Sequence, residues 1–83
     1  MMPKPTIHGA WEGYRQAIIL KDAPEVQITE CRRAFYAGAH TLMTLIMGNL
    51  NPARDPTQED VDFLSGIQRE LEAFTEGVLS GRA

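Results

Sequence analysis

The middle of this chain holds side chains whose types and spacing could bind an anionic ligand. They are two arginines, a tyrosine and a histidine: Arg32, Arg33, Tyr36 and His40. The last three are spaced i, i+3 and i+7, which places them on one face of a helix. Arginine binds phosphate or carboxylate through two parallel hydrogen bonds, and aromatic rings stack on nucleobases. The pattern predicts a site for a nucleotide-like anion.

A second group with similar side chains lies nearer the N-terminus. It consists of Trp11, Tyr14 and Arg15. A short helix through this segment could bring the three residues to the first group and complete the site. At a junction between subunits, the combined set would suit a cyclic nucleotide or a related anionic small molecule.

Both groups also have a structural interpretation. Glu30 would pair with Arg33 and Glu76 with Arg32, while the tyrosine and histidine would pack against another subunit. Trp11 and its neighbouring tyrosine would anchor the first helix. On the sequence alone this interpretation is favoured, because surface ion pairs are common and each contributes only about 0.5 kcal/mol. The two interpretations differ in whether the arginines are neutralised or free.

Other chemistry has little support in the sequence. Neither His8 nor His40 has an acidic residue or cysteine at a ligand spacing, apart from the remote Cys31, so no metal site and no cofactor are predicted. Cys31 lies in an apolar stripe and is predicted to be a buried, unreactive thiol. Since no nucleophile and base can be paired, we expect a protein that is not an enzyme.

The elements that must position these residues are three helices. Prolines mark the breaks between them, and the predicted ranges are 8–20, 24–48 and 58–79, within a single all-α domain over 1–83. Thr57 and Asp60 resemble a capping box at the start of the third helix. The second helix has an apolar stripe of Ile28, Cys31, Phe35, Leu42, Leu45 and Ile46. The third has one of Val61, Leu64, Ile67, Leu71, Phe74 and Val78.

The second helix is predicted to be covered on more than one side. Its face opposite the stripe has one cation and no acid, and a helix that is neutral all round is usually buried all round. We therefore expect a long antiparallel hairpin of the second and third helices. The short N-terminal helix would pack on this hairpin, and a second subunit would cover the remaining surface in a homo-oligomer.

Charge and composition exclude several classes of partner. Residues 1–54 hold six Lys or Arg and four acids, whereas 55–83 hold two Arg and seven acids. No basic face suits duplex nucleic acid. The uncharged run 34–53 is too interrupted by polar residues to span a membrane. With one cysteine and no signal-like N-terminus, the chain is expected in the cytoplasm.

Three segments carry a resemblance to a known group of proteins. They read W-E-x-Y-R at 11–15, A-P-x-x-Q-x-x-E-x-R-R-A-F-Y-A-G-A at 23–39 and P-T-x-x-D at 56–60. This pattern resembles small helical proteins encoded by bacteriophages and prophages of proteobacteria, and it covers most of the chain. The resemblance implies a phage origin, action inside the host cell and a role in binding.

Two functions follow from these expectations. In the first, a phage protein counters host defence by sequestering a nucleotide-type immune signal, as helical phage sponge proteins do. In the second, it inhibits a host protein by binding it through the acidic face of the third helix. That face includes Glu70, Glu72 and Glu76.

Overall fold

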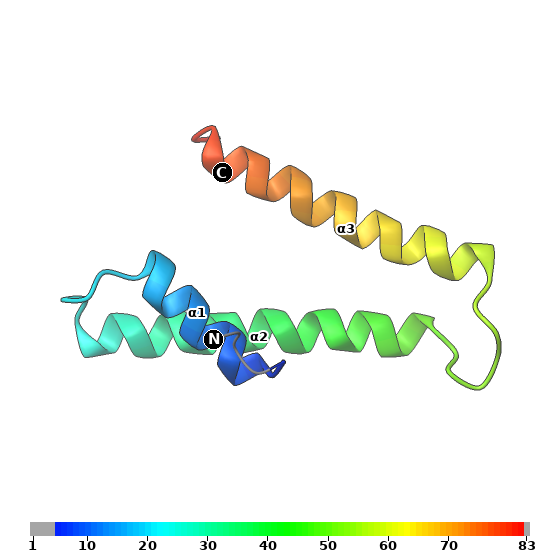
Figure 1. Cartoon of the computed structure of the whole chain (residues 1–83), viewed down its shortest axis with the longest axis horizontal. Coiled ribbons are helices and arrows are strands. Elements are labelled where there is room, and N and C mark those ends of the chain that lie inside the picture. Colours follow the sequence, from blue (N-terminus) through cyan, green and yellow to red (C-terminus); the bar gives the residue numbers. More distant parts are fainter. Residues whose placement is uncertain (1–4, 83) are drawn as a thin grey trace. The chain divides into compact units, whose positions relative to one another are not determined.

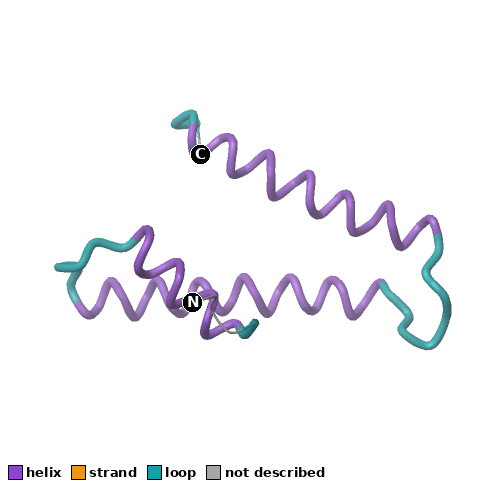
Figure 2. The backbone as a smooth tube through the Cα atoms, viewed as in Figure 1, coloured by secondary structure: helices purple, strands orange, loops and turns teal. Residues whose placement is uncertain are grey.

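The computed structural model describes residues 5–82 and contains three α-helices there, with no strand. They are α1 (Ile7–Ile18), α2 (Glu25–Asn49) and α3 (Gln58–Leu79), labelled in Figure 1. Loops join them at 19–24 and 50–57, drawn in teal in Figure 2. The predicted all-α class is confirmed.

The start of α1 is fixed by a threonine cap. The Thr6 hydroxyl accepts a hydrogen bond from the backbone N–H of Gly9 at 2.9 Å. Such a cap offsets the low helix propensity of the glycines in this short helix. At the other end, Ile19 has φ −86° and ψ 131°, so α1 ends two residues before the predicted position.

The helix α2 begins one residue later than predicted. The carbonyl of Pro24 accepts the N–H of Ile28 at 3.1 Å, so the proline caps the helix and is not part of its first turn. The half-buried side chains of α2 follow the predicted stripe, although Leu45 is 47% exposed. Cys31 was predicted to be buried, but its side chain is only half-buried.

The threonines of α2 satisfy their hydroxyl groups within the helix. Thr41 Oγ1 donates to the carbonyl of Ala37, and Thr44 Oγ1 donates to that of His40, each at 2.9 Å. These bonds explain how polar residues fit into the long uncharged segment without partners on other elements.

Both ends of α3 are closed by local hydrogen bonds. The predicted capping box is present: Thr57 Oγ1 accepts the N–H of Asp60 at 3.2 Å, and Asp60 Oδ2 accepts the N–H of Thr57 at 2.9 Å. Arg54 adds two bonds to the same carboxylate, at 3.2 and 3.3 Å. At the C-terminus, Gly81 has φ 79°, and the N–H of Arg82 donates to the carbonyl of Gly77 at 2.8 Å, as in a Schellman motif.

The chain divides into two units, residues 1–44 and 45–83. Within the first unit, α1 crosses the N-terminal half of α2 (Figure 1). The second unit holds the last turn of α2, the loop and α3. The predicted hairpin, the homo-oligomer and the pairing of Arg32 with Glu76 would each join separate units or chains, and they stay predictions.

The core of the first unit is an aromatic cluster. The Trp11 side chain is 2% exposed, and no other large apolar side chain among residues 5–82 is buried to that degree. Its ring centroid lies 5.5 Å from that of Phe35 and 6.1 Å from that of Tyr14. Aromatic pairs at such distances stabilise a fold beyond their buried area. This cluster holds α1 on α2.

In the second unit, α3 leaves its apolar stripe open. Leu64, Leu71 and Phe74 are 43%, 56% and 65% exposed. Within 5–82, no helix is both long enough and apolar enough to cross a membrane.

Candidate functional site

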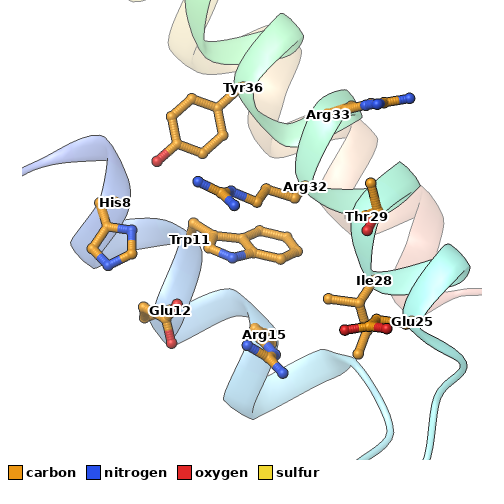
Figure 3. Close-up of a pocket in the computed structure, with 10 residues that line it drawn as sticks. All are labelled: His8, Trp11, Glu12, Arg15, Glu25, Ile28, Thr29, Arg32, Arg33 and Tyr36. Atoms are coloured by element: carbon orange, nitrogen blue, oxygen red, sulfur yellow. The ribbon is translucent and has the colours of Figure 1, made fainter.

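A pocket of about 550 Å³ lies between α1 and the first half of α2 (Figure 3). From α1 it is lined by His8, Trp11, Glu12 and Arg15. From α2 it is lined by Glu25, Ile28, Thr29, Arg32, Arg33 and Tyr36. Pockets that hold small ligands typically measure about 300–1,000 Å³. All ten residues belong to the first unit, so this pocket forms within one chain and needs no second subunit.

The Trp11 side chain is a structural anchor in the wall of the pocket. Because 98% of its surface is covered, the indole offers no open face on which a ligand ring could stack. The indole packs edge-on against the Phe35 ring, and the planes of the two rings are inclined by 62°. Trp11 thus fills the structural role that the sequence left open, and the pocket depends on it because it holds α1 in place.

Arg32 and Tyr36 line the α2 side of the pocket. The guanidinium carbon of Arg32 lies 5.7 Å from the centre of the Tyr36 ring, within range of a cation–π contact. Tyr36 is half-buried and packs edge-on against Phe35, with 6.3 Å between ring centroids. In Figure 3, Arg32 points from α2 toward the space between Trp11 and Tyr36. No ion pair involves Arg32 in the described part of the chain.

Arg33 borders the same pocket but has another partner. Its Nη1 lies 3.3 Å from Oε1 of Glu30, so the predicted pair of Glu30 and Arg33 is present. Both side chains are well exposed, at 74% and 65%, and Figure 3 shows Arg33 pointing away from Tyr36. An exposed pair of this kind contributes little to stability. The two adjacent arginines therefore have different surroundings: Arg33 pairs with Glu30, and Arg32 lies over Tyr36.

Arg15 is the second cation that borders the pocket without an ion-pair partner among the described residues.

Two other predicted site residues do not line the pocket. Tyr14 stacks on Trp11 and tilts against Phe35, so it belongs to the aromatic cluster. His40 is exposed one turn beyond Tyr36 and does not line the pocket.

Five of the pocket residues were not predicted as site residues: His8, Glu12, Glu25, Ile28 and Thr29. A signal for two of them was present, because His8, Glu12 and Arg15 are spaced i, i+4 and i+7 and share one face of α1. The pattern of cations and aromatic rings gave no indication of the acids. Glu12 and Glu25 give the pocket a mixed charge in place of a purely basic one.

Metal binding has no support in the described residues. No three of their His, Cys, Asp and Glu side chains lie close enough together to hold an ion. The pocket's chemistry is instead that of hydrogen bonding and charge. Its arginines can donate hydrogen bonds to phosphate or carboxylate oxygens, and its two glutamates can accept them from N–H groups.

Comparisons of the chain with protein-family models, with curated proteins and with solved structures found no match. The resemblance to phage proteins therefore stays an expectation from the sequence. The interpretation of the pocket depends on the residues that line it.

Proposed function

We propose that this protein binds and sequesters a small anionic ligand of the nucleotide class in the pocket between α1 and α2, without transforming it. The observation that carries the proposal is the placement of Arg32. Its guanidinium has no ion-pair partner among the described residues and is held over Tyr36, at a pocket of about 550 Å³.

The phosphate of such a ligand would be held from two helices. Arg15 on α1 and Arg32 on α2 both line the pocket. A guanidinium donates up to five hydrogen bonds in a planar fork that matches phosphate oxygens. Because neither side chain has an acidic partner within 4 Å in the described chain, a phosphate would gain charge-assisted bonds without breaking an existing ion pair.

The base of the ligand would stack on the α2 side. Arginine planes and aromatic rings both accept nucleobases on their faces. Arg32 already lies over the Tyr36 ring, so a base would stack on the guanidinium, which itself rests on the phenol ring. Phe35 packs edge-on against Tyr36 and helps to hold that ring in place.

Sequestration by a phage protein is the biological role that we propose for this binding. It is supported by the resemblance of 11–15, 23–39 and 56–60 to phage and prophage proteins. A protein that binds a host's nucleotide signal lowers its free concentration and so blocks the defence that the signal activates. Assembly into a homo-oligomer would multiply the number of sites in each particle.

The two adjacent arginines provide the test. Isothermal titration of the full chain with AMP, GMP, cyclic AMP, a cyclic dinucleotide and inorganic phosphate measures Kd for each. We expect at least one nucleotide to bind, and Arg32→Ala to weaken that binding about tenfold or more, because a charge-assisted bond is lost. The matched variant Arg33→Ala should weaken it no more than about threefold, since that side chain points away.

Two results would overturn the proposal. One is the absence of a heat signal or thermal protection with every nucleotide at millimolar concentration. The other is an equal loss of affinity in both arginine variants, which would indicate a diffuse charge effect. Circular dichroism of each variant shows whether α1 and α2 are intact.

A second candidate function is inhibition of a basic host protein by α3. The observation that favours it is that Glu70, Glu72 and Glu76 are all exposed, and none has an ion-pair partner in the described chain. Replacing all three by lysine should abolish capture of the basic protein from a host lysate. The Arg32→Ala change should leave that capture intact. Capture that persists after charge reversal would contradict this function.

A further inference from the structure

The carboxylate of Glu12 has no structural partner, although it lines the pocket. Glu12 is half-buried on α1 and lies one turn after His8. Within 5–82, its side chain makes no hydrogen bond and no ion pair, even though Arg15 lies three residues further along the same helix. Partial removal of a carboxylate from water is unfavourable unless another group compensates it.

The other acids of this region have a structural explanation. Glu25 lies in the first turn of α2, where the positive end of the helix favours a negative charge. Glu30 pairs with Arg33 at 3.3 Å. Neither explanation applies to Glu12, because it lies beyond the first turn of α1 and has no cation within 4 Å in the described residues. An anion-binding pocket would also bind phosphate better without this charge.

The presence of Glu12 therefore points to the part of the ligand that donates hydrogen bonds. We propose that Glu12 selects guanine, so that the ligand class of this pocket is a guanine nucleotide; this inference rests on the proposed function. A carboxylate has two acceptor oxygens side by side. Guanine places two donors, N1–H and the N2 amino group, side by side on its Watson–Crick edge.

The other common bases do not offer that arrangement. Adenine and cytosine each place an acceptor nitrogen beside their amino group, and uracil has one N–H between two carbonyls. Against any of these, a carboxylate would face at least one acceptor, and the repulsion would reject the base. A matched bidentate pair between a side chain and a base gives about 1–3 kcal/mol of discrimination, or roughly 5- to 150-fold in affinity.

The pocket places the complementary groups together. Glu12 and Arg15 come from α1, while Arg32 and Tyr36 come from α2, and all four line one pocket (Figure 3). A nucleotide is a molecule with an anionic end and, in guanine, a donor-rich end. The mixed charge of the lining fits such a ligand better than a simple anion such as sulfate.

The experiment compares GMP, IMP and AMP by isothermal titration with the full chain. IMP is the sharpest probe, because it differs from GMP only in lacking the N2 amino group. We expect GMP to bind about tenfold or more tightly than IMP, and IMP more tightly than AMP. In Glu12→Gln, GMP affinity should fall to about that of IMP, since an amide presents one acceptor and one donor.

The matched variant Glu25→Gln separates base recognition from charge. It removes the other pocket carboxylate and should change the affinities of GMP, IMP and AMP by the same factor, so that their ratios stay fixed. Equal affinities of GMP and AMP in the wild type would overturn the guanine inference and leave the proposed function standing. Failure of all three to bind would overturn both. A Glu12→Gln variant that binds every nucleotide more tightly would also contradict the inference.

Discussion

The helices α1 and α3 start in the same way but are stabilised by different means. Each begins with a threonine whose hydroxyl caps the third residue of the helix. In α1 that residue is Gly9, which has no side chain to accept a hydrogen bond from the cap residue. In α3 it is Asp60, whose carboxylate accepts the N–H of Thr57 and also binds Arg54. Conversely, α1 buries Trp11, and α3 buries no large apolar side chain.

The difference shows two ways of holding an amphipathic helix. A 12-residue helix with two glycines is not stable alone in water, so α1 depends on its contact with α2. The 22-residue α3 has local bonds at both ends, and its apolar stripe remains available to other surfaces. Three experiments test this contrast, from the largest expected effect to the smallest.

The Trp11→Ala change should have the largest effect. Truncation of a buried tryptophan typically costs about 3–5 kcal/mol, because apolar contacts are lost and a cavity remains. We expect α1 to detach from α2, with a loss of helical signal in circular dichroism and of nucleotide binding. Urea denaturation measures the change in stability. Tyr14→Ala is the matched control, and it should cost less because Tyr14 is 42% exposed. If Trp11→Ala and Tyr14→Ala lowered the free energy of unfolding equally, the role of Trp11 as the anchor would be contradicted.

The open stripe of α3 is tested next, by Leu71→Asp. Leu71 is 56% exposed and lies at the centre of the stripe. If this stripe packs on a second copy, a buried aspartate would break the contact. Light scattering after size-exclusion chromatography should give at least twice the mass of one chain for the wild type and the mass of one chain for the variant. Glu72→Gln, its neighbour, should leave the mass unchanged. A wild type that is monomeric at micromolar concentration would contradict the homo-oligomer.

The smallest effect is expected from lowering the pH, which weakens the cap at the start of α3. The backbone N–H of Thr57, together with Arg54, holds the pKa of the Asp60 carboxyl below its ordinary value of 3.8, despite partial burial. Because the folded-state pKa is the lower one, this carboxylate stabilises α3 fully above about pH 3.8, and the contribution is lost as the pH falls through the folded value. The melting temperature of the wild type should therefore fall between about pH 6 and pH 2, and that of Asp60→Asn should fall less steeply. If the melting temperatures of the two proteins had the same dependence on pH, Asp60 would not be the group responsible.

The sequence predicted best what depends on neighbouring residues. The capping box at Thr57 and Asp60 was predictable because its signal lies within four positions. The end of α1 was placed two residues too late, because Ile18 and Ile19 look equally helical. Their difference is in the backbone, which turns extended at Ile19.

The pocket could be predicted only in part, because it depends on contacts between helices. Helical spacing put Arg32 and Arg33 near the site but could not tell which guanidinium would lie over Tyr36 and which would pair with Glu30. Trp11 was equally ambiguous until its burial was known. Glu12 was missed because simple charge complementarity predicts no acid in a pocket that is expected to bind an anion.

The internal hydrogen bonds of Thr41 and Thr44 have a consequence for the uncharged middle of α2. With each hydroxyl hydrogen directed to a carbonyl four residues back, only the acceptor lone pairs of these two oxygens still bind water. A helix that packs on this stretch would therefore displace fewer hydrogen-bonded waters than it would from threonines whose hydroxyl hydrogens point to solvent. The internal bonds thus lower the cost of covering this surface without removing it.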